Sequence, residues 1–156
     1  MATPVIDAHV EIILGLSKPP PEPFRYRSAL ELVKTLGSEF SPILGPELGP
    51  LKQCFKNAGR IVLEAPERYV YVEGFAVISD DLPLPVAHAW VYDLVDAQAV
   101  EVTWETVGSE YLGLPVQFDF LRGMVLAREV WGILDAREML LKEADQERFL
   151  YPLTFR

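Results

Sequence analysis

Three residues in the middle of the chain have side chains suited to acyl transfer: Cys54, His88 and Glu101. A thiolate is the nucleophilic form of cysteine, an imidazole can accept the thiol proton, and a carboxylate can orient the imidazole and stabilise its charged form. The three residues occur in the order nucleophile, base and orienting acid, 34 and then 13 residues apart. These residue types predict a cysteine-dependent acyl-transfer site that requires neither a metal nor a cofactor.

Cys54 follows Gly49-Pro50 at the start of a helical pattern over residues 51–64. Unpaired N–H groups and the helix dipole favour negative charge in a first turn, so a thiol there tends to have a lowered pKa. The same N–H groups, with the Gln53 side chain as a second donor, could hold the oxyanion of a tetrahedral intermediate. The competing interpretation is that Cys54 is a small buried apolar residue on the helix stripe.

His88 and Glu101 belong to two consecutive strand patterns. Period-two alternation places His88 and Trp90 on one face of the first strand, and Glu101 on the matching face of the second if the two strands pair. The competing interpretations are a half-buried histidine bonded to a backbone carbonyl and a solvent-facing glutamate. Trp90 is a candidate for substrate binding, although a core position is the more common use of such a residue.

The elements that would position these residues follow from hydrophobic periodicity and from the prolines and glycines between them. Helices are expected over residues 28–36, 51–64, 124–134 and 136–144, and strands over 69–78, 86–95 and 99–104. The sequence therefore predicts a single α+β domain with N-terminal helices packed on an antiparallel sheet. We divide it into an N-terminal arm and helix (1–50), a core (51–120) and C-terminal helices (121–156). Residues 105–120 are mixed, with Gly113 and Pro115 as breaks.

Composition excludes several classes of protein. The chain has 156 residues, of which half are hydrophobic, so it is not of the disordered type. Its net charge is −9, which disfavours binding to a phosphate backbone. A single cysteine rules out an intramolecular disulfide and a multi-cysteine zinc site. Neither a signal peptide nor an apolar run of membrane-spanning length is present. We expect a cytoplasmic protein without nucleic-acid or membrane partners.

Read together, the motifs resemble the transglutaminase-like branch of the papain-like cysteine hydrolases. The matching positions are Cys54 at the head of a helix, His88-Ala89-Trp90 in a strand, and Glu101-Val102-Thr103-Trp104 in the next. The resemblance covers roughly residues 51–120 and extends to small bacterial and phage proteins of this type. Glu101 stands where the family has aspartate, and Val102 where it has proline.

The resemblance implies a papain-like or transglutaminase-like core and a Cys54–His88–Glu101 triad acting on a peptide or amide. Water as acceptor would make the protein a hydrolase, and an amine would make it a transglutaminase. An alternative is a noncatalytic acidic binding or inhibitor protein of bacterial or phage origin on the same scaffold, and a third interpretation is a virion structural protein. Contact between Cys54 and His88 would favour the enzyme over the other two.

Overall fold

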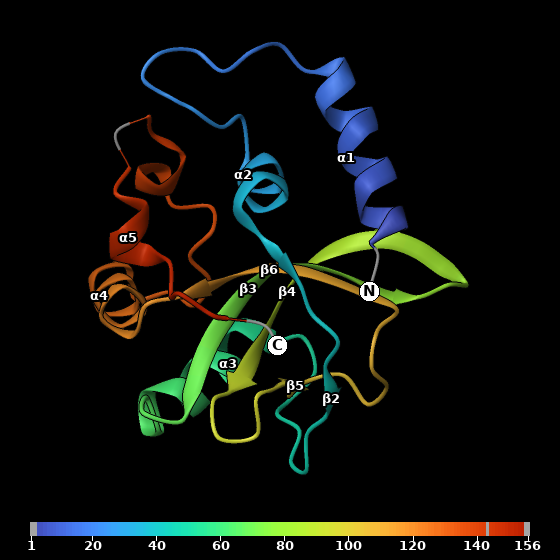
Figure 1. Cartoon of the computed structure of the whole chain (residues 1–156), viewed down its shortest axis with the longest axis vertical. Helices are drawn as coiled ribbons and strands as arrows, with labels where there is room; N and C mark the ends of the chain where they lie inside the picture. The colour runs from blue at the N-terminus through green and yellow to red at the C-terminus, as the bar shows by residue number, and fades with distance from the viewer. Residues whose placement is uncertain (1–2, 143, 155–156) are drawn as a thin grey trace.

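The computed structural model of the chain describes residues 3–142 and 144–154, and its centre is a mixed six-stranded sheet (Figure 1). In spatial order the strands are β1 (Ser38–Glu39), β6 (Glu110–Val116), β3 (Tyr69–Ser79), β4 (Leu82–Asp93), β5 (Gln98–Glu101) and β2 (Ile43–Leu44). The long β3–β4 hairpin forms the middle of the sheet, and the pairs are antiparallel except β2 with β5, which is parallel. The α+β class is confirmed, but the three predicted strands account for only half of the six-stranded sheet, which is also not wholly antiparallel.

The helices are α1 (Pro4–Leu16), α2 (Ala29–Leu36), α3 (Cys54–Glu64), α4 (Phe118–Arg128) and the short α5 (Gln146–Phe149), with a 3₁₀ turn at Arg137–Leu140. Local chemistry explains where two of them begin. The Ser28 hydroxyl accepts from the N–H of Glu31 and so caps α2, while Pro4 occupies the first turn of α1, where its missing N–H costs nothing.

The two faces of the sheet carry different cores. The four longer helices lie on one face, where Ala58 and Val62 of α3 pack with Tyr71 and Ala89 of the sheet. The other face carries Trp90, Tyr111 and Val72, covered by Phe40 and by partly buried residues such as Trp104. Because side chains alternate along a strand, His88 shares the second face with Trp90 while Ala89 faces the helices.

Two paired glycines at the centre of the sheet leave no space for a side chain. Gly74 of β3 pairs with Gly113 of β6, and a Cβ on Gly113 would come within 2.8 Å of the Trp90 ring. A Cβ on Gly74 would meet the carbonyl oxygen of Leu112 at 2.1 Å. Gly113 is therefore part of a strand and not the break that the sequence suggested, and residues 110–116 form β6.

The C-terminal third departs most from expectation. The helix predicted over 124–134 overlaps α4 only at residues 124–128, because α4 runs from Phe118 to Arg128 and ends at Glu129, which adopts the left-handed conformation. Of the helix predicted over 136–144, the described residues have only the 3₁₀ turn Arg137–Leu140. Gly132 also has positive φ, and the N–H groups of Ile133 and Leu134 bond to the buried Glu73 carboxylate. Those amides cannot serve a helix at the same time, so a long-range contact overrides the local periodicity.

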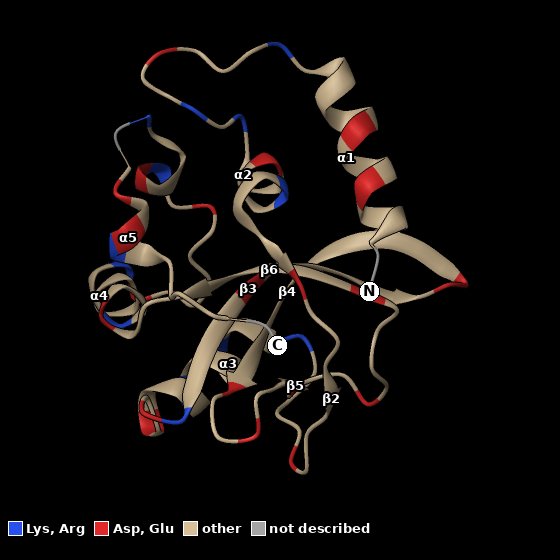
Figure 2. Ribbon diagram, in the orientation of Figure 1, with Lys and Arg blue, Asp and Glu red and all other residues tan. Residues whose placement is uncertain are grey.

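Acidic residues lie at separate positions along α1, the hairpin tips and the C-terminal helices (Figure 2). This spread fits a solvated acidic surface. Within the described residues, no helix combines the length and apolar character needed to cross a membrane.

We expect Gly74→Ala to lower the free energy of unfolding by more than about 2 kcal/mol, because a Cβ there clashes with backbone that cannot move aside. Gly123→Ala, in the middle of α4 with no atom near the new Cβ, is the matched control and should raise stability by about 0.5–1 kcal/mol. Urea unfolding of both variants checks this. Equal effects of the two substitutions would contradict the packing described here.

Candidate functional site

Glu101 and His88 form a buried pair. Glu101 is the last residue of β5, and its Oε1 lies 2.8 Å from Nε2 of His88. The side chains are 0% and 1% exposed. Oε1 also accepts from the Tyr111 hydroxyl at 2.7 Å, and Oε2 accepts from the N–H groups of Thr103 and Trp104. The four donors match the acceptor capacity of a carboxylate, so the group is buried without an unmet lone pair.

This network fixes the ionisation state of Glu101 and the tautomer of His88. Burial alone would raise the pKa of Glu101, but the hydrogen bond and charge of His88, with the bonds from Tyr111 and Thr103, bring it below its ordinary value of 4.5. Glu101 is therefore ionised at neutral pH and can only accept. Nε2 of His88 must then carry the proton, which leaves Nδ1 as the ring nitrogen that a second partner can use.

Aromatic rings enclose the pair. The Trp104 ring stacks on the His88 ring with centroids 3.8 Å apart and planes 14° apart. Trp104 thereby shields one face of the imidazole, while its backbone N–H holds Glu101. The Tyr111 hydroxyl accepts from the N–H of Gly108 as it donates to Glu101, so the loop between β5 and β6 is tied to the same carboxylate.

Cys54 is the first residue of α3 and is half-buried. The N–H groups of Ala89 and Phe55 are directed at its sulfur. β5 pairs with β4 only over residues 91–93, so the start of α3 can reach the backbone of β4 at Ala89. The thiol thus meets β4 at the residue after His88. In the described part of the chain, no hydrogen bond joins the thiol to the imidazole.

The expected lowering of the thiol pKa is wrong. Burial raises the pKa of Cys54 above its ordinary value of 9.0, and the charges of Glu73 and Glu101 raise it further. The N–H groups of Ala89 and Phe55 oppose this shift but do not reverse it. The donors of a helix first turn favour a thiolate, but here the loss of water around the half-buried thiol outweighs them, and two carboxylates of the sheet add to its effect. The resting group is a thiol at neutral pH.

Asn57 connects the helix of Cys54 to the strand of Glu101. Its side-chain amide donates to Thr103 Oγ1 at 2.9 Å and to the Pro50 carbonyl at 3.0 Å. The N–H of Gly49 bonds to the Val102 carbonyl at 2.9 Å, so the loop before α3 runs alongside the same segment. The start of α3 is thereby held in a fixed position relative to Glu101.

The remaining predicted site residues lie in different surroundings. Gln53 is exposed at the N-cap of α3, and its side chain makes no capping hydrogen bond. Trp90 is 0% exposed and packs edge-on against Tyr111, so we assign it to the core.

Sequence reasoning did not find the roles of Tyr111, Asn57 and Glu73. The sequence contained one indication for Tyr111, because the apolar run from 111 to 116 is typical of a buried strand, but its glycine and proline obscured that strand.

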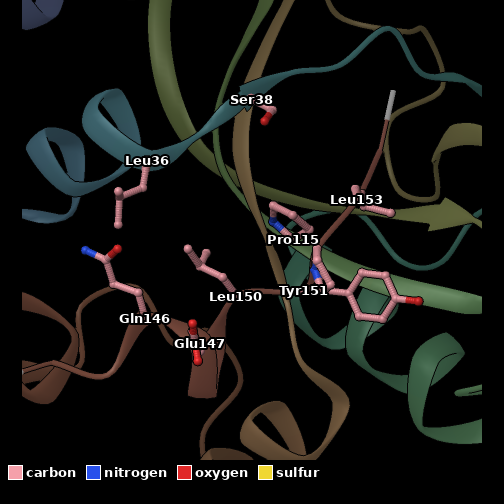
Figure 3. A pocket seen from close by; sticks show the side chains of 9 residues that line it. Leu36, Ser38, Pro115, Gln146, Glu147, Leu150, Tyr151 and Leu153 are labelled. Atoms are coloured by element: carbon pink, nitrogen blue, oxygen red, sulfur yellow. The ribbon is translucent and has the colours of Figure 1, made fainter. Parts of the chain in front are cut away.

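The described residues contain no group of three or more His, Cys, Asp or Glu side chains placed to hold a metal ion. A cavity of about 350 Å³ lies where the C-terminal segment crosses β6, with Leu36, Pro115, Leu150 and Tyr151 in its lining (Figure 3). A second cavity, of about 490 Å³, adjoins the start of α3 and is lined by Phe55, Glu73 and Ala87 among others. Only the second cavity borders the elements that carry Cys54 and His88.

No protein-family model matches the chain, and neither the curated proteins nor the solved structures compared with it include a significant match.

We expect Glu101→Gln to lower the free energy of unfolding by about 2–4 kcal/mol, because an amide nitrogen would replace one saturated acceptor. Since the folded pKa of Glu101 lies below the unfolded value, its ionisation stabilises the protein above about pH 4.5, and this contribution is lost as the pH falls through the folded pKa. Denaturant unfolding between pH 3 and 7, roughly the range over which carboxylates titrate, measures both effects.

Glu105→Gln, an exposed glutamate four residues away, is the control and should change stability by less than about 0.5 kcal/mol. If Glu101→Gln kept the wild-type stability and its decline in acid, Glu101 would not be the ionised centre of this network.

Proposed function

We propose that the protein is a cysteine-dependent acyl-transfer enzyme acting on amide or peptide-like substrates, with Cys54 as nucleophile, His88 as base and Glu101 as the residue that orients His88. The observation that carries the proposal is the buried ionised Glu101 bound to Nε2 of His88. It leaves Nδ1 as the nitrogen able to take a proton, in the residue next to the one whose N–H meets the thiol. On this proposal the fold is a papain-like or transglutaminase-like core.

The proposed reaction has two steps. As the Cys54 sulfur bonds to the substrate carbonyl carbon, the thiol proton passes to Nδ1 of His88, and His88 then returns it to the departing amine as the carbon–nitrogen bond breaks. In the second step a water or an amine attacks the thioester with His88 again as base. The thiol is then restored, and the product is a carboxylic acid or a new amide.

The raised pKa of Cys54 decides how the first step proceeds. A thiol that is neutral at rest must lose its proton during attack, so His88 acts as a general base and not as the cationic half of a preformed ion pair. Glu101 supports this role because its charge stabilises the imidazolium as it forms. Unpaired N–H groups in the first turn of α3, with the exposed Gln53 amide, are the proposed donors to the oxyanion.

A noncatalytic binding protein on the same scaffold is the second candidate. Two observations favour it: the pKa of Cys54 is raised, and His88 is 1% exposed. A histidine buried in this way also serves as a satisfied polar group that specifies the packing of the second face. The two candidates differ in whether His88 affects the chemistry of Cys54.

We expect p-nitrophenyl acetate to acetylate Cys54 at neutral pH, with release of one nitrophenolate for each adduct seen by mass spectrometry. His88→Ala should slow this acylation by about 100-fold or more, because it removes the general base. Cys54→Ala should abolish the adduct.

His9→Ala is the matched control, since His9 lies on α1 and has no place in the proposed reaction. Equal acylation rates in the wild type and in His88→Ala would show that the thiol reacts without His88, and the binding protein would then be the better explanation.

A further inference from the structure

The cavity beside α3 is walled by elements that meet at Cys54. Its floor includes the cross-strand pair Phe75 and Ala87, and the next pair on the same face of the sheet is Glu73 and Ala89. Glu73 also lines the cavity, while the N–H of Ala89 points at the Cys54 sulfur. Phe55, the residue after Cys54, contributes to the wall. The thiol and the cavity therefore share neighbours on both the helix and the sheet.

The opposite wall is the segment 129–135, and buried contacts hold it in place. The Glu73 carboxylate, 4% exposed, accepts from the N–H groups of Ile133 at 2.9 Å and Leu134 at 2.8 Å, and from the Tyr71 hydroxyl. Trp131 lies so close to α3 that a Cβ on Gly59 would come within 2.6 Å of its ring. The cavity is therefore built between fixed surfaces and is not a gap beside a loose loop.

The lining defines the chemistry that would fill the cavity. Phe55, Phe75 and Trp131 provide aromatic surface, and Val130 and Leu134 extend it. Because Glu73 already receives three donors, it does not call for a cationic ligand. The cationic group of the lining is Arg128, whose side chain is 32% exposed and whose Nη2 lies 3.4 Å from Asp135. An apolar group flanked by an acceptor oxygen fits this environment.

We propose that this cavity is the specificity pocket of the site: it takes an aromatic or branched aliphatic side chain of a peptide-like substrate, with a carbonyl or carboxylate oxygen of the same residue accepting from Arg128. The proposal rests on the proposed function in taking Cys54 as the reacting atom. It adds the substrate class, which is a peptide with a bulky apolar residue at the bond attacked.

The test compares two alkylating probes with the same reactive group, N-iodoacetyl-L-phenylalanine and N-iodoacetylglycine. In each, the Cys54 sulfur displaces iodide as a carbon–sulfur bond forms and the thiol proton is lost to solvent. Both probes carry one carboxylate, so the acidic surface repels them equally. We expect the phenylalanine probe to alkylate Cys54 at least about tenfold faster, because its ring leaves water for the cavity.

Ala87→Leu should bring the ratio of the two rates close to one, because the added side chain enters the cavity from an exposed strand position. Ala127→Leu is the matched control: Ala127 is also exposed, does not line the cavity and should leave the ratio unchanged. Arg128→Met should slow the phenylalanine probe about tenfold or more, as expected when a charged hydrogen bond is lost. A wild-type ratio near one, or a ratio unaffected by Ala87→Leu, would overturn the pocket, and an unaffected rate in Arg128→Met would overturn the role of Arg128.

The same measurements separate this pocket from the proposed reaction. Alkylation needs no turnover, so the ratio should survive His88→Ala even though acylation by p-nitrophenyl acetate falls. A high ratio of the two alkylation rates, together with an acylation rate that His88→Ala leaves unchanged, would support the pocket and reject the enzyme. A ratio near one together with His88-dependent acylation would retain the enzyme and reject the pocket.

Discussion

A carboxylate removed from water must receive donors for its lone pairs, and three buried glutamates of the sheet impose this requirement on the rest of the structure. Glu110 accepts from the first N–H groups of α1, Glu73 from Ile133 and Leu134, and Glu101 from Thr103 and Trp104. In each case the donors are backbone amides of a segment that packs against the sheet. The N-terminal helix, the C-terminal wall and the loop after β5 are thus attached to one sheet by the same kind of contact.

The carboxylates that organise the fold also influence the chemistry near Cys54. Glu101 fixes the tautomer of His88, and the charges of Glu73 and Glu101 add to burial, the main cause of the raised pKa of the thiol. Near the oriented imidazole of His88 the Cys54 thiol is protonated at rest. On the proposed function, the thiol would lose its proton to His88 only as it attacks a carbonyl. Glu73 also shapes the cavity, since the segment that it holds forms one of the cavity walls.

The sequence was informative where the structure depends on local periodicity. The apolar stripe after Pro50 predicted the helix that begins at Cys54, and strand alternation placed His88 and Glu101 on one face, where they form their pair. The sequence did not predict the features that depend on contacts between distant residues. Gly113 looks like a break but lies in a strand beneath Trp90, and residues 129–134 were expected to be helical, whereas the amides of Ile133 and Leu134 bond to Glu73. The raised thiol pKa could not be foreseen either, because it depends mainly on how deeply the sheet and helix bury Cys54, and to a smaller extent on carboxylates of two later strands.

The central claim is that Glu101 holds the proton on Nε2 of His88 so that Nδ1 can serve Cys54. Nitrogen NMR of the His88 ring, in the wild type and in Cys54→Ala at neutral pH, tests it most directly. We expect Nε2 to carry the proton, Nδ1 to be bare, and the Nδ1 resonance to move when the thiol is removed. A proton on Nδ1 with an unprotonated Nε2, or an Nδ1 resonance that is the same in the wild type and in Cys54→Ala, would contradict the claim.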